Sequence, residues 1–227
     1  IWCPDIGDTF GPGYLDHEIL RERRRAGEET WWYTMCVPRH PYPTWLVDDD
    51  ASAHRVFCWM QALYGITGFV YSQVNGWSED PYRDVASFAG SNGDGLLLYP
   101  GDPYGAAEPF PSIRLHVIRD ALEDYECLHL LREENLRVLR NLGAPDAEAL
   151  ADGVVAAHCR RLIASERAFS RRPADFACAR RDLLEEILHS RDRPRLVVAL
   201  AEGSAVATDV RSVARAVPTD MKSVAPS

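Results

Sequence analysis

The first hundred residues alternate between apolar extended runs and amphipathic helical runs, and this alternation constrains the fold most strongly. Strands are predicted at Ile1–Cys3, Thr30–Val37 and Ile66–Val74, where apolar, aromatic and β-branched side chains stand between Gly, Pro and Asp clusters. Helices are predicted from an Asp16 cap to Gly27 and from Ala51 to Gly65. Strand–helix–strand units of this size imply parallel neighbouring strands joined by crossover helices.

After residue 75 the pattern changes from alternation to long helices. A loop leads to a short strand at Leu96–Tyr99, and Ser112 is predicted to cap a long helix. Two further helices are predicted at Ala147–Ser170 and Phe176–Ser190. From about Ala201 the chain is rich in small residues without a sharp period, which is typical of a weakly ordered segment.

Three strands are too few to close a parallel barrel, and a bare parallel edge would be exposed. Either further strands precede Ile1 in a longer protein, or the chain forms a small open α/β sheet; the start inside a strand favours the first. We therefore expect an α/β fold, the C-terminal part of a (β/α)8 TIM-like barrel followed by a helical extension. The expected divisions are residues 1–110, 111–200 and a tail at 201–227.

Composition excludes several classes of function. A net charge of −9 and a pI near 5.3 argue against a nucleic-acid binder, and no apolar run is long enough to span a bilayer. The six cysteines include no C-x-x-C pair, and the single Glu126-x-x-His129 is half of a di-metal motif, so neither a metal nor a cofactor is predicted. Phosphate-loop, dinucleotide and serine-hydrolase motifs are absent from the sequence. The sequence predicts neither an oligomeric state nor a cellular compartment.

The chemistry is expected at the carboxyl ends of the predicted strands, where parallel α/β folds bind ligands. Aromatic side chains with nearby carboxylate and amide groups gather there, and such surfaces suit the apolar faces and hydroxyl rims of sugars. Tyr71, Gln73 and Asn75 share a parity and would form an inward polar row in a barrel.

Several of these polar residues also have a purely structural explanation. Asp5, followed by Gly7, is as well explained as a loop-capping residue, and Glu79-Asp80 before Pro81 is typical of a turn. Asn92-Gly93-Asp94-Gly95 is predicted to be a tight turn whose glycines adopt positive φ, from which Asp94 could still face a pocket.

Four phrases in order, IWCPD, TWWYTMCVPRHPYPTWLVDDDASAHRVFCWMQALYGITGFVYSQVNGW, NGDGLLLYPG and PSIRLHVIRDALEDYECLHLLRE, carry a family resemblance. Over roughly residues 1–135 the chain resembles the domain of unknown function 4091, which is similar to the catalytic barrel of family 123 glycoside hydrolases. Beyond Arg140 the helices are generic.

The resemblance implies a β-N-acetylgalactosaminidase-like activity by a substrate-assisted route, an exception to the two-carboxylate scheme. In that route an adjacent Asp-Glu pair acts: the Glu protonates the leaving oxygen and the Asp orients the acetamido nucleophile. The pair belongs on a strand N-terminal to the IWCPD phrase, so the catalytic residues are expected upstream of Ile1. Glu79-Asp80 has the reverse order and another place.

The resemblance further implies that this chain supplies pocket-lining residues for a carbohydrate substrate. The substrate-binding residues it indicates are Trp2, Asp5, Tyr33, Tyr71, Asn75 and Trp77. An aromatic residue would be expected where Ser72 stands, which leaves the sugar preference open. An exported bacterial enzyme would fit the family.

Two alternatives stay open from the sequence. One is a non-catalytic carbohydrate-binding or structural barrel domain, because barrels host many functions. The other is a helical interaction module at residues 112–200, which explains the long helices but not the aromatic strand ends.

Overall fold

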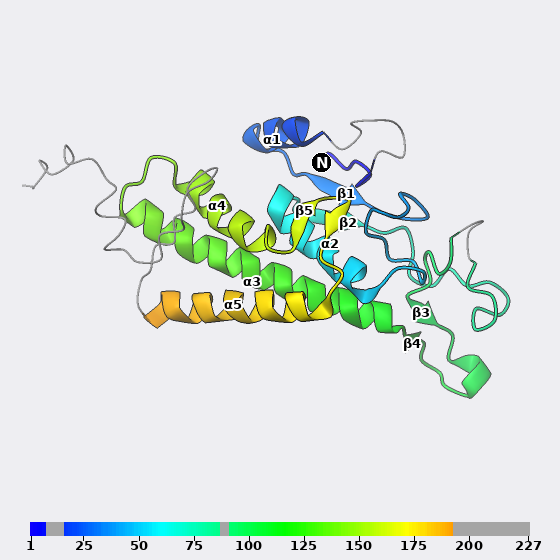
Figure 1. The fold of residues 1–227 in the computed structure, drawn as a ribbon. Coiled ribbons are helices and arrows are strands. Elements are labelled where there is room, and N and C mark those ends of the chain that lie inside the picture. Colours follow the sequence, from blue (N-terminus) through cyan, green and yellow to red (C-terminus); the bar gives the residue numbers. More distant parts are fainter. Residues whose placement is uncertain (8–15, 87–90, 193–227) are drawn as a thin grey trace, which may run out of the picture.

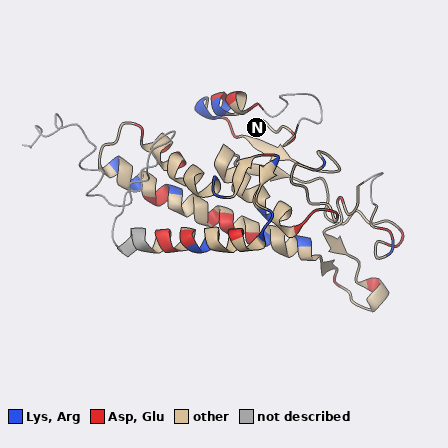
Figure 2. Ribbon diagram, viewed as in Figure 1, with Lys and Arg blue, Asp and Glu red and all other residues tan. Residues whose placement is uncertain are grey.

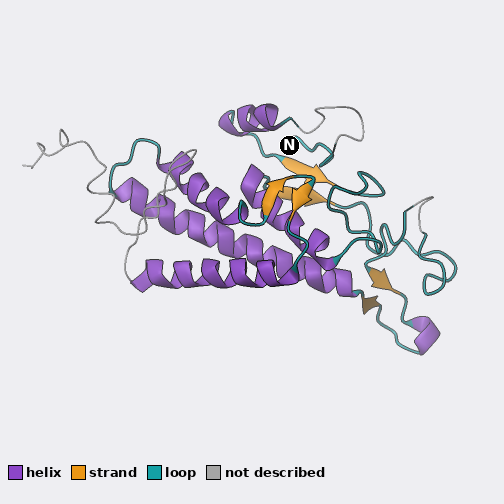
Figure 3. Cartoon of the chain, viewed as in Figure 1, coloured by secondary structure: helices purple, strands orange, loops and turns teal. Residues whose placement is uncertain are grey.

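The computed structural model describes residues 1–7, 16–86 and 91–192. In this part of the chain, long helices form most of the body and the strands are short (Figures 1 and 3). The tail at 201–227, expected to be weakly ordered, lies outside the described residues.

A parallel layer lies where the sequence predicts strand–helix–strand units. Strand β1 (Trp31–Tyr33) pairs in parallel with β2 (Gly68–Val70), and helix α2 (Ala51–Tyr64) connects them. Parallel bridges from Trp2 to Thr30 and from Asp5 to Tyr33 add the N-terminal segment on the other side of β1. The predicted parallel arrangement is therefore confirmed for three neighbouring segments.

The strands are shorter than predicted, and a closed barrel is not present among the described residues. Strand β1 ends at Tyr33 because the chain then turns, with the Met35 amide donating to the Val37 carbonyl, ahead of three prolines. The prediction of one strand through Val37 is wrong for this reason.

Close packing within the layer depends on Gly68. A Cβ atom there would lie 2.3 Å from ring carbons of Trp31, so the missing side chain lets the indole lie across β2. The neighbouring Trp32 points to the opposite face and is fully buried, as strand alternation predicts.

The predicted helix ends are confirmed where local chemistry determines them. Asp16 accepts hydrogen bonds from the amides of Glu18 and Ile19 at the start of α1 (His17–Arg25), and Gly27 beyond its end has φ 78°. Among the three aspartates before α2, Asp50 is the cap, and Gly65 ends the helix with φ 67°.

Helix α3 (Ile113–Asn141) forms the axis of the helical body. Ser112 caps it by accepting from the Leu115 amide at 3.3 Å, as predicted. Helix α4 (Ala147–Cys159) and helix α5 (Pro173–Asp192) both pack on α3, which also contacts α2 (Figure 1).

The helix predicted at Ala147–Ser170 is wrong in its second half. It ends at Cys159, and the chain then forms an antiparallel pair of β5 (Ile163–Ser165) and β6 (Ala168–Phe169). Ile163 is almost fully buried, so tertiary packing overrides a local sequence without turn signals.

Near residue 100 an antiparallel pair extends from the body as an arm. Strand β3 (Leu98–Tyr99) pairs with β4 (Phe110–Pro111), and a 3-10 turn η1 (Asp102–Tyr104) lies between them. Figure 1 shows the arm projecting away from the helices beyond the start of α3.

One apolar core joins the strand-bearing and helical parts. Trp32 of β1 and Phe57 of α2 belong to the same buried cluster as Leu131 of α3, Val154 of α4 and Leu183 of α5. The core therefore continues across residue 110, where the sequence suggested a division. No described helix has the length and apolarity that crossing a membrane requires.

A buried carboxylate ties three helices together at the edge of this core. Asp124 of α3 is fully buried and accepts from Arg55 Nε at 2.7 Å and Trp59 Nε1 at 2.8 Å, both on α2. Arg180 Nη1 of α5 lies 3.2 Å from its other oxygen. Two guanidinium groups and an indole N–H thus offset the cost of burying one negative charge.

A second carboxylate, Glu166 in the β5–β6 turn, holds the first residue of α1. Hydrogen bonds from His17 and Tyr64 lower the pKa of Glu166 from 4.5 to about 2. Because the pKa of Glu166 is lower in the folded state than in the unfolded state, this carboxylate stabilises the fold at pH values above its unfolded-state pKa. The contribution is lost as the pH falls through its folded-state pKa.

We expect Glu166→Gln to lower the free energy of unfolding by about 1–3 kcal/mol at neutral pH, because the shift corresponds to about 1.4 kcal/mol per unit. Urea unfolding at several pH values measures this. The difference from the parent chain should shrink as the pH falls from about 5 to about 2. Glu18→Gln, which removes an exposed ion pair, is the control; an equal, pH-independent loss in both variants would contradict the assignment.

Candidate functional site

The carboxyl ends of β1 and β2 converge on one buried side chain, Asp94. Its carboxylate accepts from the hydroxyl of Tyr71, one residue beyond β2, at 3.0 Å. It also accepts from the backbone amides of Cys36, beyond β1, and Gly95. The Tyr71 oxygen in turn accepts from the Gly95 amide at 2.8 Å. We call Asp94, Tyr71 and these amides the Asp94 hub; it fixes two strand ends to one turn.

The turn that carries Asp94 has the predicted conformation. Gly93 and Gly95 have φ values of 74° and 68°, which only glycine adopts without strain. Asp94 itself is 1% exposed, so its carboxylate acts by positioning the surrounding loops.

Arg114, near the start of α3, binds the loop that contains Gly93 and Asp94. Its guanidinium donates to the carbonyls of Trp45 at 2.6 Å and Gly93 at 2.8 Å, and also to that of Leu96. A cation at a helix N-terminus opposes the helix dipole, so these three carbonyl contacts have to offset that cost.

Burial determines the electrostatics of the hub. Desolvation raises the pKa of Asp94, although hydrogen bonds from Tyr71 and two amides, and the nearby charge of Arg114, act in the opposite direction. Desolvation also raises the pKa of Tyr71, so its hydroxyl stays protonated and donates to the carboxylate.

Tyr71 belongs to the aromatic core through its ring. The ring centroid lies 5.0 Å from that of Trp45, and Trp45 packs at 4.3 Å against Phe69 of β2. The tyrosine thus has an apolar body in the core and a polar end in the hub.

Asp5 and Tyr33 are brought together at the ends of the first two parallel segments. Their backbones are bridged, with the Tyr33 amide donating to Pro4 and the Ile6 amide donating to Tyr33. Asp5 is fully buried and accepts from the Gly7 amide at 2.7 Å, the loop-capping contact that the sequence offered as one explanation.

Asn75 and Trp77 lie further along, where the chain leaves the hub for the arm. Asn75 is exposed and forms an antiparallel bridge with Leu96. Trp77 is 44% exposed and donates from Nε1 to the Leu98 carbonyl at 2.7 Å. The inward polar row predicted from Tyr71, Gln73 and Asn75 is not formed, because β2 ends at Val70 and both Gln73 and Asn75 are exposed.

Trp2 is separated from the other predicted residues. It pairs with Thr30, at the amino-terminal end of the parallel layer, and the Arg23 guanidinium of α1 lies 5.3 Å from its ring centroid. Glu79-Asp80 forms the predicted turn, in which the Asp80 carbonyl accepts from the amides of Arg83 and Asp84.

A protein-family model matches the segment of the chain that contains most of these residues. The model of the glycoside hydrolase 123 catalytic domain matches residues 5–131, more than half of the chain. The chain belongs to glycoside hydrolase family 123. The matched segment of this family 123 chain contains the whole Asp94 hub and Arg114, as well as Asn75 and Trp77.

Among solved structures, a family 123 glycoside hydrolase from Clostridium perfringens, described in a study of glycolipid glycan hydrolysis, is similar to this chain. The two are 20% identical, with a TM-score of 0.49, over 78% of this chain and 29% of the other. The family 123 chain described here thus spans under a third of that relative's length. No curated protein matches this chain.

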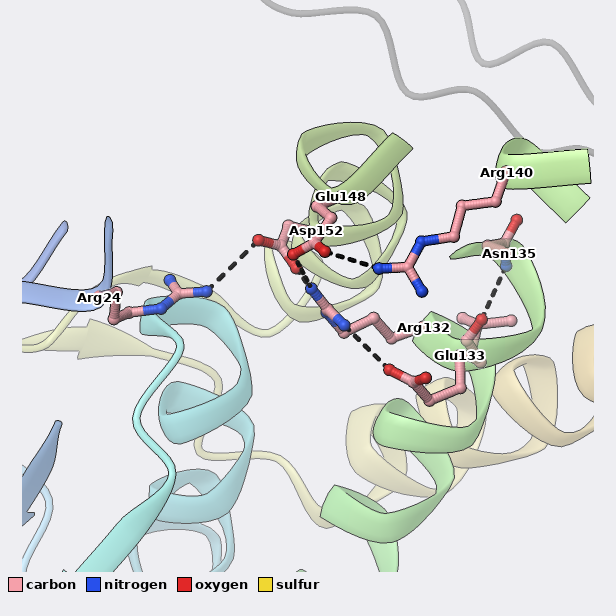
Figure 4. A network of polar contacts seen from close by, with 8 residues as sticks. Arg24, Arg132, Glu133, Asn135, Arg140, Glu148 and Asp152 are labelled. Carbon is pink, nitrogen blue, oxygen red and sulfur yellow. Dashed lines mark hydrogen bonds and ion pairs between the residues drawn. The ribbon is translucent and has the colours of Figure 1, made fainter. Parts of the chain in front are cut away.

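Figure 4 shows a second polar network of the family 123 chain. The Arg24 guanidinium of this network lies beside Gly65, which precedes β2. Arg132 of α3 donates from Nε to Asp152 of α4 at 2.6 Å, and Arg24 of α1 approaches the same carboxylate at 3.4 Å. Arg140 and Glu148 extend it at 2.7 Å. A cavity of about 310 Å³ lies beside Arg24, Arg132 and Asp152.

These contacts join α1, α3 and α4, and pair each cation with a carboxylate, which is the pattern of a structural network. Figure 2 shows the same mixture of both charge signs along the helices. Within the described ranges, no three His, Cys, Asp or Glu side chains come together as metal ligands would.

Sequence reasoning missed Arg114 and the link between Tyr71 and Asp94. A signal for Arg114 was available, since it lies in the first turn after the Ser112 cap, where a cation opposes the helix dipole. The Tyr71–Asp94 contact spans 23 residues and has no local signal.

Proposed function

We propose that this chain is the C-terminal part of a (β/α)8 glycoside-hydrolase barrel whose whole protein hydrolyses N-acetylhexosaminide bonds. Residues 1–110 would supply its last strand–helix units and residues 111–200 a helical extension. The main support is the parallel layer whose carboxyl ends converge on the Asp94 hub, since barrel enzymes bind substrate at that end.

In this proposal the chain contributes substrate binding and not the acid. Tyr33 is the last residue of β1, and Asp5 supports the loop beside it. The residues that follow β2 are Tyr71, Asn75 and Trp77. The catalytic Asp-Glu pair is expected on a preceding strand, and the sequence of this chain contains no Asp-Glu dipeptide. Membership of a glycoside hydrolase family favours a carbohydrate substrate.

The test compares this chain with the longer protein on 4-nitrophenyl N-acetyl-β-galactosaminide. We expect no turnover by the 227-residue chain, and turnover by the longer protein that disappears when the upstream Glu is changed to Gln. Turnover by the shorter chain alone would contradict the placement of the acid upstream.

A variant inside the chain tests the proposed pocket. Tyr71→Phe in the longer protein should lower kcat/KM by about tenfold, because the tyrosine end of the hub loses its hydrogen bonds and a small misplacement is costly. Unchanged kinetics would contradict a role for the hub. A longer protein without an upstream pair or turnover would indicate a sugar-binding relative that lacks the chemistry.

A further inference from the structure

The arm and the loop at residues 77–86 carry four exposed aromatic side chains. Tyr104 of η1 is 66% exposed, Phe110 of β4 41%, Tyr82 37% and Trp77 44%. Rings of this size are rarely left in water in a group, and such patches on a protein surface usually bind something.

The rings form a continuous surface. The centroid of Tyr82 lies 5.3 Å from Tyr99 and 5.0 Å from Tyr104, and Tyr104 lies 6.3 Å from Phe110. We call Tyr82, Tyr99, Tyr104 and Phe110 the aromatic platform.

The platform is held in place through its polar ends. The Tyr82 hydroxyl donates to the Pro100 carbonyl at 2.8 Å, and Trp77 donates to the Leu98 carbonyl. Carbonyls two residues apart point to the same edge of a strand, here the edge of β3 opposite β4. These bonds satisfy that edge and fix the rings, while Tyr104 and Phe110 remain exposed without an equivalent structural role.

The charge around the platform restricts what it could bind. Residues 77–86 and 98–111 contain five carboxylates and one cation. The acidic residues are Glu79, Asp80, Asp84, Asp102 and Glu108. The cation, Arg83, lies 3.5 Å from Asp80. Carboxylates accept hydrogen bonds from hydroxyl and amide groups and repel phosphate, sulfate and sialyl groups.

The platform also adjoins the proposed substrate end of the layer. The Gly76 amide donates to the Gly95 carbonyl at 2.8 Å, and Asn75 bridges Leu96, so the base of the arm is fixed to the Asp94 hub.

From these observations we propose that the aromatic platform is a glycan subsite for neutral or N-acetylated hexose units, remote from the bond that is cleaved. The rings stack on the apolar faces of the sugars, and the surrounding carboxylates accept from sugar hydroxyl and amide groups. This rests on the proposed function only in that the ligand is a glycan, and binding is measurable without hydrolysis.

The test titrates the 227-residue chain with a neutral trisaccharide of β-linked N-acetylhexosamine and follows tyrosine and tryptophan fluorescence and heat release. We expect saturable binding that Tyr104→Ala weakens by about 3- to 10-fold and Tyr104→Ala with Phe110→Ala weakens further. Leu142→Ala, at an equally exposed apolar position after α3, is the matched control and should bind as the parent chain does.

Several outcomes of the binding experiment overturn the proposal. Absence of binding by the parent chain, or equal affinity in Tyr104→Ala, excludes a subsite here. Equal or tighter binding of a sulfated analogue excludes the charge argument. If sedimentation instead shows a concentration-dependent dimer that Tyr104→Ala dissolves, the platform joins two copies of the chain. Failure of hydrolysis by the longer protein with binding intact would count against the proposed function alone.

Discussion

Replacing Asp124 by alanine is expected to lower the free energy of unfolding by about 3–5 kcal/mol, because removing one partner of a buried ion pair leaves the other charge uncompensated. Arg55 and Arg180 both approach this carboxylate, and Trp59 also loses its acceptor. Urea unfolding followed by circular dichroism at 222 nm measures the change.

The matched control lies one helical turn earlier on α3. Asp120 pairs with Arg119 at 2.9 Å, but both side chains are largely exposed, so Asp120→Ala should change stability by less than about 1 kcal/mol. If Asp124→Ala and Asp120→Ala lower the free energy of unfolding equally, the buried contacts of Asp124 with α2 and α5 do not stabilise the fold more than an exposed ion pair does.

The Asp94→Ala substitution is expected to lower the free energy of unfolding by about 2–4 kcal/mol. The substitution leaves the Tyr71 hydroxyl and the Cys36 amide without their acceptor, while the Gly95 amide keeps its bond to the Tyr71 oxygen. Each buried unsatisfied donor costs about 1–3 kcal/mol. Relief of the desolvation of the carboxylate offsets part of the sum. Denaturant unfolding of Asp94→Ala, Tyr71→Phe and the double variant gives the coupling between the two side chains.

The stability that Asp94 contributes is expected to decrease as the pH rises. Burial raises the folded-state pKa of Asp94 above 3.8, so its contribution is fully present below that value and declines as the pH rises through the folded pKa. The advantage of the parent chain over Asp94→Asn should therefore shrink as the pH rises from about 4 toward neutrality. Additive effects of Asp94→Ala and Tyr71→Phe would contradict the hub, and an advantage that grows with pH would contradict the dominance of desolvation over the hydrogen bonds to Asp94.

The parts of the fold that could be predicted are those that neighbouring residues determine. Caps at Asp16 and Ser112 and the helix stops at Gly27 and Gly65 depend on residues within one turn. The β5–β6 pair could not be predicted in this way, because Ile163 is placed by a core built from distant helices.

The candidate site was predictable as a list of residues and not as an arrangement. Tyr71 and Asp94 were each singled out, but the bond between them depends on how the turn at Gly93 folds back on β2. Trp2 shows the converse, since its sequence neighbour Asp5 lies toward the carboxyl ends of the layer while Trp2 lies at the other end.

The length of the family match has a consequence for how this protein can be divided. The match ends at residue 131, inside α3, yet Leu128 and Leu131 are fully buried in a cluster that includes Val154 and Leu183. A chain cut at the end of the match would expose these leucines and lose Arg180, a partner of Asp124. The segment that the family model matches is therefore shorter than the segment that folds, and the helices beyond it are a structural requirement of the piece that carries the matched residues.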